Sequence, residues 1–139
     1  MNPGFESPRR LQIFQDMFEL TVREEFAAAH QLRGYEGACE NLHGHNWQVE
    51  VSVRGKELNE IGILLDFKEL KRALREVVAE LDHRFLNEHP AFGKENPSSE
   101  NLARYIYQRL CEKLSGHPVK VSRVTVCETE RACATYLPD

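Results

Sequence analysis

The hydrophobic pattern of the 139-residue chain changes its period twice, and this change limits the folds that the chain can adopt. Apolar and polar residues alternate over residues 18–23 and again over 47–54, as they do on half-buried β-strands. Over residues 67–81, apolar residues instead recur every three or four positions, which is the spacing of one apolar helix face. The first half of the chain therefore predicts two strands, joined through a glycine-containing loop at 33–39, and then a helix.

The second half of the chain predicts another helix and two more strands. Ser98 or Ser99 can cap a helix whose apolar residues again follow a helical spacing. Alternation then predicts a strand over residues 119–126, with an irregularity near Ser122, and a last strand over 132–137. The order ββααββ keeps strands and helices apart in the sequence. It predicts an α+β domain, with an antiparallel sheet and two helices on one face.

Length and charge restrict the class of protein. We expect one domain over residues 16–139, preceded by a flexible N-terminal tail at residues 1–15. The formal net charge is -4, and no run or stripe of basic residues predicts a nucleic-acid-binding face. No stretch approaches the roughly 18 apolar residues of a membrane span, and the N-terminal residues lack the apolar core of a signal peptide. We therefore expect a cytoplasmic protein that binds neither nucleic acid nor membrane.

The four cysteines are Cys39, Cys111, Cys127 and Cys133, and they form no CxxC pair and no spacing typical of a disulfide framework. In a reducing cytoplasm we expect all four to be free thiols. Cys111 falls in a helical pattern and Cys127 in a strand pattern, so both are predicted to be small buried hydrophobes.

His43 and His45 flank Gly44 at the start of the second predicted strand. Side chains at i and i+2 of a strand point to the same face, so the two imidazoles project together. A catalytic zinc ion takes three protein ligands and keeps one position open. The first predicted strand runs on through EEFAAAH, so His30 lies near its end and can fall close to the pair if the two strands pair. The three histidines predict a Zn²⁺ site, whereas the HxH pair alone is equally compatible with two surface histidines.

The residue pattern leaves the roles of five other residues open. Cys39 is either a fourth zinc ligand, which would close the site, or a base beside an open site, because a nearby cation lowers the pKa of a thiol. Glu40 is either a solvated loop carboxylate or a second base. Asp82 and His83 are either a helix end with a dipole-complementing histidine or a catalytic pair. Glu128 is either an exposed strand carboxylate or an anchor for the NH and NH₂ groups of a guanidine-like heterocycle.

Six segments taken together resemble the 6-pyruvoyltetrahydropterin synthase family. The resemblance covers residues 18–136, and six such motifs in the same order are highly specific, whereas one would be weak. The segments are FAAAH, CENLHGHN, GILLDFKELK, LDHRFLN, NPSSENLA and CET. The resemblance implies the tunnelling fold, in which ββααββ subunits assemble by their sheets into an oligomeric barrel. The common assembly is a homohexamer made of two trimers, with active sites between subunits.

The resemblance also implies roles for the metal-binding and catalytic residues. His30, His43 and His45 match the zinc ligands of the family. Cys39 matches its catalytic thiol rather than a ligand. The aspartate–histidine pair at 82–83 matches the pair that completes the proton-transfer set.

Other residues match the substrate-binding parts of the family. Glu128 matches the carboxylate that anchors the pterin. Ser98, Ser99 and Glu100 match a segment that helps to line the pterin pocket from an adjacent subunit. Glu40 has no single match, because two branches of the family use this position differently.

The spacing within CENLHGH separates those branches. The chain has C-x₃-HGH, which resembles the bacterial 6-carboxy-5,6,7,8-tetrahydropterin synthases of the queuosine pathway, whereas animal 6-pyruvoyl enzymes resemble C-x₅-HGH. Glu40 also satisfies E-x₂-HGH, which is typical of a folate-pathway branch. One motif therefore fits two patterns, and the intact Cys39 favours the carboxy branch.

The resemblance implies a zinc-dependent carbon–carbon lyase. Its reaction converts 7,8-dihydroneopterin triphosphate to 6-carboxytetrahydropterin, acetaldehyde and triphosphate. The alternatives are a dual or folate-pathway synthase that forms 6-hydroxymethyl-dihydropterin, a 6-pyruvoyltetrahydropterin synthase, and a non-catalytic zinc-stabilised binding module. The binding module explains the cysteine and histidine cluster but not Asp82, His83 and Glu128. Aldolase-like and GTP cyclohydrolase-like activities belong to proteins with other motifs.

Overall fold

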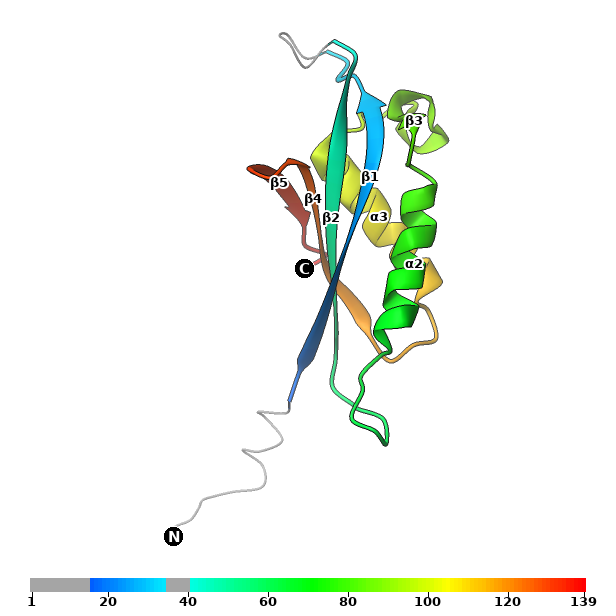
Figure 1. Cartoon of the computed structure of the whole chain (residues 1–139), viewed down its shortest axis with the longest axis vertical. Helices are drawn as coiled ribbons and strands as arrows, with labels where there is room; N and C mark the ends of the chain where they lie inside the picture. Colours follow the sequence, from blue (N-terminus) through cyan, green and yellow to red (C-terminus); the bar gives the residue numbers. More distant parts are fainter. Residues whose placement is uncertain (1–15, 35–40) are drawn as a thin grey trace.

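The structure is a computed structural model that describes residues 16–34 and 41–139 (Figure 1). Its main elements follow the predicted order of two strands, two helices and two strands. They are β1 (Phe18–His30), β2 (His43–Gly55), α2 (Phe67–Ala79), α3 (Ser99–Lys113), β4 (Lys120–Thr129) and β5 (Ala132–Tyr136). Between the helices lie the two-residue strand β3 (Arg84–Phe85) and the 3-10 turns η2 (Leu86–Glu88) and η3 (Pro90–Phe92). Across the described ranges, no helix is both long enough and apolar enough to cross a bilayer.

The five strands form one sheet in the order β3-β1-β2-β4-β5. β1 and β2 pair antiparallel along their whole length, from Phe18 opposite Gly55 to His30 opposite His43. Figure 1 shows α2 and α3 on the same side of this sheet. The α+β class and the two helices on one face are therefore confirmed.

Strand β3 adds a feature that the hydrophobic pattern did not indicate. It pairs parallel with β1, with Arg84 opposite Ala28 and Phe85 opposite Ala29, so the sheet is mixed. Two residues are too few to show a period of two in the sequence. β3 lies at an edge of the sheet, where it carries the chain from the end of α2 along β1.

The predicted Ser98 cap and the predicted strand irregularity are confirmed, and Asp66 caps α2. The Asp66 side chain accepts a hydrogen bond from the backbone N–H of Lys68, and Ser98 accepts one from that of Asn101. These bonds satisfy N–H groups that have no partner within the helix. The β2–β4 register shifts beside Ser122, which is the irregularity that the sequence predicted in the third main strand.

Trp47 lies between the hydrophobic core and the end of the β1–β2 pair that carries the histidines. Its side chain is fully buried and stacks on Phe26, with ring centroids 5.9 Å apart. Its Nε1–H donates a hydrogen bond of 3.1 Å to the backbone carbonyl of Ala28, so the indole is buried without an unpaired donor. The centroids of the His30 and His45 rings lie 4.9 and 5.1 Å from that of the indole, in edge-to-face arrangements. The core therefore supports these two histidines directly.

The cysteine predictions are wrong in two respects. Cys127 and Cys133 form a disulfide between β4 and β5, and Cys111 is exposed on α3. Cys127 and Cys133 are directly opposite each other in the antiparallel pair, with Cα atoms 4.0 Å apart. Alternation places Cys127 on the face opposite that of the buried Val126. The pairing depends on the register of two strands, which spacing along the sequence does not reveal.

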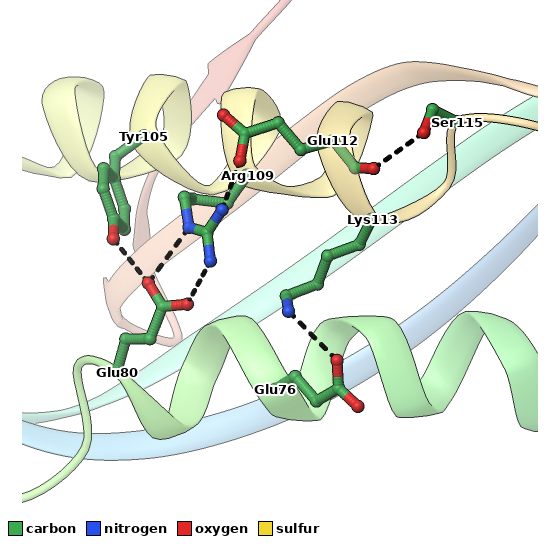
Figure 2. Close-up of polar contacts among 7 residues, drawn as sticks. All are labelled: Glu76, Glu80, Tyr105, Arg109, Glu112, Lys113 and Ser115. Atoms are coloured by element: carbon green, nitrogen blue, oxygen red, sulfur yellow. Dashed lines mark hydrogen bonds and ion pairs between the residues drawn. The ribbon is translucent and has the colours of Figure 1, made fainter.

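A cluster of charged side chains joins the end of α2 to α3 (Figure 2). Glu80 accepts hydrogen bonds from Arg109 Nε and Nη2, at 3.2 and 2.7 Å, and from the Tyr105 hydroxyl at 2.5 Å. Lys113 and Glu76 form a second, more exposed pair at 3.0 Å. The Arg109 hydrogen bonds lower the pKa of Glu80, and burial together with the Glu80 hydrogen bond raises the pKa of Tyr105 to about 12.

The substitution Glu80→Gln is expected to lower the free energy of unfolding by about 1–2 kcal/mol at pH 7, because it removes the charge from this cluster. The folded-state pKa of Glu80 is lowered, so its contribution is present above the unfolded-state value of about 4.3 and is lost as the pH falls through the folded value. Urea unfolding of both proteins between pH 7 and pH 3 measures this difference. Glu112→Gln, which changes a more exposed partner of Arg109, is the control and should have little effect. A difference for Glu80→Gln that did not depend on pH would contradict this account.

Candidate metal centre

Three histidines meet where β1 ends and β2 begins. His30 is the last residue of β1 and lies opposite His43, the first residue of β2. His45 follows two residues later and lies on the same face as His43. The ring centroids of the three imidazoles are separated by 4.5, 4.8 and 5.2 Å. The strand pairing therefore brings together the three residues that the sequence predicted to converge.

Hydrogen bonds to the backbone determine which ring nitrogens face one another. His30 Nδ1 lies 2.7 Å from the carbonyl of Pro97, and His43 Nδ1 lies 2.7 Å from the carbonyl of Asn41. Carbonyl oxygens only accept, so both Nδ1 atoms donate, and each neutral ring keeps its lone pair on Nε2. The two Nε2 atoms are 2.9 Å apart. Two lone pairs facing at this distance repel each other unless a proton or a cation lies between them, so the arrangement suits a metal ion.

Burial keeps two of the imidazoles in the form that binds metals. His30 is 1% exposed, and burial lowers its pKa. Burial also lowers the pKa of His45. Both rings therefore favour the neutral state, and only a neutral imidazole has a lone pair available for a cation.

A carboxylate completes the cluster. Glu128 Oε2 lies 2.9 Å from His45 Nε2 and 3.7 Å from His30 Nε2. His45 Nε2 is buried, and the geometry of this contact does not make a hydrogen bond. One ligand atom from each of His30, His43, His45 and Glu128 lies within 4.8 Å of the other three, so the group can hold a metal ion. Nitrogen and carboxylate ligands of this kind suit zinc.

The position of Glu128 is the part of this cluster that the sequence analysis missed. The pattern predicted that Glu128 contacts a heterocycle, and it gave no reason to place the residue beside His45. The β2–β4 register explains the placement, because Cys127 lies opposite Gln48 and the next residue of β4 turns to the face of Trp47 and His45. A prediction of the β2–β4 register would have placed Glu128 beside His45.

Asp82 and His83 are fixed to β1 by two hydrogen bonds. Asp82 Oδ1 accepts a hydrogen bond of 2.9 Å from the backbone N–H of Ala27, and the His83 N–H donates one of 2.6 Å to the Ala27 carbonyl. The carboxylate also lies 3.0 Å from His83 Nδ1. The Ala27 hydrogen bond, more than the contact with His83, lowers the pKa of Asp82. Asp82 is therefore held as an anion that orients the imidazole.

His83 has a backbone conformation that is unusual for its residue type. Its φ angle is +57°, in the left-handed region that non-glycine residues seldom adopt. Its ring is exposed. Residues held in this way cluster at functional sites.

An open hollow of about 470 Å³ lies beside the sheet where β1, β2 and β3 meet. Its lining includes Ala27, Ala29, Gly44, His45 and His83. The two alanines and the glycine leave this part of the lining with little side-chain bulk. The lining of this hollow therefore includes His83, one member of the predicted catalytic pair, and His45, a predicted metal ligand.

The remaining predicted site residues have different positions. Ser98 caps α3, and Glu100 is exposed. Ser99 is buried, and its hydroxyl has no hydrogen-bond partner among the described residues. Together with the Pro97 carbonyl, this segment lies behind His30 in the same chain. Its predicted contact with a pterin in an adjacent subunit stays a prediction. Cys39 and Glu40 lie outside the described residues.

Comparison with known proteins identifies the family. The family model for 6-pyruvoyl tetrahydropterin synthase matches residues 19–139. The chain belongs to this family. The match includes the three histidines, Asp82, His83 and Glu128, so the whole described site falls within it.

Named relatives of the family cover most of the chain. A putative 6-carboxy-5,6,7,8-tetrahydropterin synthase of Archaeoglobus fulgidus is 42% identical over 109 residues, which are 78% of this chain and 86% of the relative. A 6-carboxy-5,6,7,8-tetrahydropterin synthase of Synechocystis is 40% identical over 116 residues, covering 80% of this chain and 86% of the relative. A dihydroneopterin monophosphate aldolase of Pyrococcus furiosus is 41% identical over 109 residues, with 78% and 88% covered.

Solved structures show the same fold. The 6-pyruvoyl tetrahydropterin synthase of Caenorhabditis elegans superposes with a TM-score of 0.80 at 28% identity, over 90% of this chain and 98% of that one. The ββααββ arrangement expected from the sequence is thus the tunnelling fold of the family.

The substitution His45→Asn is expected to weaken zinc binding by at least about 100-fold, because it removes one nitrogen donor of the cluster, and loss of an outer partner alone weakens such sites 10–100-fold. Competition with a chromophoric chelator measures the affinity. His117→Asn is the matched control, since His117 lies after α3 and is not one of the four clustered residues. Equal zinc affinity in the wild type and the His45→Asn protein would show that His45 is not a metal ligand.

Proposed function

We propose that the chain is a zinc-dependent 6-carboxy-5,6,7,8-tetrahydropterin synthase. It would convert 7,8-dihydroneopterin triphosphate to 6-carboxytetrahydropterin, acetaldehyde and triphosphate, as a cytoplasmic lyase of queuosine biosynthesis. The observation that carries the proposal is the pair of inward-facing Nε2 atoms of His30 and His43, 2.9 Å apart, next to His45. Relatives that carry this name, at 34–42% identity over most of the chain, support it. The assembly that we propose is the homohexamer typical of the family.

Different residues of the chain would bind the metal and transfer protons in this reaction. When bound, zinc supplies a Lewis acid that stabilises negative charge on the side-chain oxygens of the substrate. His30, His43 and His45 would hold it, with their orientation fixed by the carbonyls and the indole that contact them. Cys39 as a thiolate would take a proton from one face of the substrate side chain.

The Asp82–His83 pair would serve the other face of the substrate. The carboxylate at 3.0 Å from Nδ1 fixes the imidazole orientation and favours a proton on that nitrogen. Nε2 is then free to accept a proton or, after protonation, to return it. The exposed ring lines the open hollow, so a substrate there has direct access to it.

Glu128 would anchor the pterin ring. Its two carboxylate oxygens match the adjacent NH and NH₂ donors of the heterocycle. The residue is about two-thirds buried at the end of the histidine cluster, so the anchor and the metal would address neighbouring parts of one ligand.

The substitution Glu128→Gln is expected to weaken the binding of a non-reacting pterin roughly tenfold to a hundredfold, because hydrogen bonds to a charged group contribute about 1.5–3 kcal/mol. Calorimetric titration of the zinc-loaded protein measures this loss. Zinc at saturation should remain one ion per chain, which separates loss of the anchor from loss of the site. Unchanged pterin affinity would sink the assignment of Glu128.

A second candidate function is a dual or folate-pathway synthase that forms 6-hydroxymethyl-dihydropterin. Three observations favour keeping it. Glu40 satisfies E-x₂-HGH, and a solved Plasmodium vivax 6-pyruvoyltetrahydropterin synthase, 26% identical with a TM-score of 0.71, carries an alanine in place of a catalytic glutamate. The aldolase of Pyrococcus furiosus is also a relative at 41% identity. A 6-pyruvoyltetrahydropterin synthase is a weaker candidate, because the cysteine lies three residues before HGH rather than five.

A product assay distinguishes these candidates. The wild type, Cys39→Ala and Glu40→Ala proteins would each be incubated with dihydroneopterin triphosphate, and the pterins identified by mass. The carboxy synthase predicts 6-carboxytetrahydropterin from the wild type, its loss in Cys39→Ala, and near-normal amounts in Glu40→Ala. Each variant serves as the matched control of the other, because the two positions are adjacent. Selective loss of a hydroxymethyl product in Glu40→Ala would instead establish the dual function.

A further inference from the structure

Glu128 lies at a point of the sheet where backbone pairing does not fix its position. On one side, the pairing of β4 with β2 ends at Cys127, opposite Gln48. On the other side, the β4–β5 register shifts between Cys127 and Thr129, which leaves Glu128 without a partner in β5. Within the described ranges, Glu128 therefore has no Cα partner on either neighbouring strand.

A covalent bond lies directly beside this unpaired residue. Cys127 immediately precedes Glu128, and its disulfide with Cys133 joins β4 to β5 at the last regular pair before the register shift. Beyond the shift there remain only the pair of Thr129 with Ala132 and the tight turn between them. The disulfide is thus the strongest constraint on the segment that carries Glu128.

The rest of β5 is held by contacts that do not involve the disulfide. The Thr125 and Thr135 hydroxyls are 2.7 Å apart, and the Tyr136 ring lies 4.9 Å from that of Tyr107 on α3, measured between centroids. β5 therefore has its own attachment at its far end. Breaking the disulfide would release the end near Glu128 and leave the strand in place.

We propose that the Cys127–Cys133 disulfide is a redox-sensitive positioning element for Glu128. When the bond is closed, the carboxylate stays 2.9 Å from His45 Nε2, next to the metal-binding histidines. When the bond is open, the segment around Glu128 relaxes, and the negative charge near the metal is lost. This inference rests on the metal site of the proposed function and adds control of its affinity.

The proposed step is an ordinary thiol–disulfide exchange. A dithiol reductant attacks one sulfur, the Sγ–Sγ bond breaks, and two electrons and two protons reach Cys127 and Cys133 as the reductant closes its own disulfide. Cys133 is exposed and Cys127 is half-buried, so a small reductant can reach the bond. No group of the metal site takes part in the exchange.

The first measurement establishes the bond. Alkylation of the denatured protein, before and after reduction, should show two additional modified cysteines per chain after reduction. Equal labelling in the two samples would overturn the proposal, because the two thiols would then be free.

The second measurement tests the effect on the metal site. We expect the double variant Cys127→Ser, Cys133→Ser to bind zinc about tenfold more weakly than the wild type, the lower end of the loss seen when a group that orients a metal ligand is removed. Competition with a chelator, using zinc alone, gives the affinity. Reduced wild-type protein, freed of the dithiol without exposure to oxygen, should match the double variant. Cys111→Ser, a change on the exposed surface of α3, is the matched control and should have no effect.

Glu128→Gln distinguishes positioning from general stabilisation. In this background the removal of the disulfide should no longer change zinc affinity, because the carboxylate that it positions is already neutral. If removal of the disulfide weakened zinc binding equally in the wild-type and the Glu128→Gln backgrounds, the bond would have a structural role only, and the inference would be overturned. Equal zinc affinity in the oxidised protein and the double variant would also overturn it, while leaving the proposed function intact. Absence of zinc binding in every form would overturn both.

Discussion

The antiparallel pairing of β1 with β2 is the constraint on which the rest of the structure depends. It runs for 13 residues without an irregularity and ends with His30 directly opposite His43. Because side chains alternate between the faces of a strand, a slip of one residue would send every inward-facing histidine and valine of β2 to the other face. The same register that buries the core therefore also builds the metal cluster. The metal-binding histidines are therefore brought together by the same strand pairing that forms the fold.

Trp47 shows how closely the core and the site are linked. The indole fills the space between the apolar part of the sheet and the imidazoles, and its N–H is satisfied by the backbone of β1. The Pro97 carbonyl, just before α3, holds His30 from the other side. The histidines thus sit in rigid surroundings although they lie at strand ends, and rigid support is what a metal ligand requires.

The features that could be predicted from the sequence are those with a local period or a local motif. Alternation identified the strands, the apolar spacing identified α2 and α3, and the HxH pair with His30 indicated a metal site. The features that could not be predicted arise from register between distant segments. Examples are the two-residue strand β3, the disulfide of Cys127 with Cys133, and the contact of Glu128 with His45. Each depends on which residues of neighbouring strands lie opposite one another, and no period along one strand contains that information.

The left-handed backbone of His83 has a consequence for how such a chain can evolve. A residue other than glycine in this conformation costs on the order of 1–3 kcal/mol, whereas glycine adopts it without strain. Selection for stability alone would favour glycine at this position, and the loss of an exposed imidazole would leave the core untouched. A histidine here is consistent with a second selective pressure, one that acts on chemistry at the surface of the hollow. At position 83, selection for thermal stability would therefore favour glycine, whereas selection for activity would favour histidine.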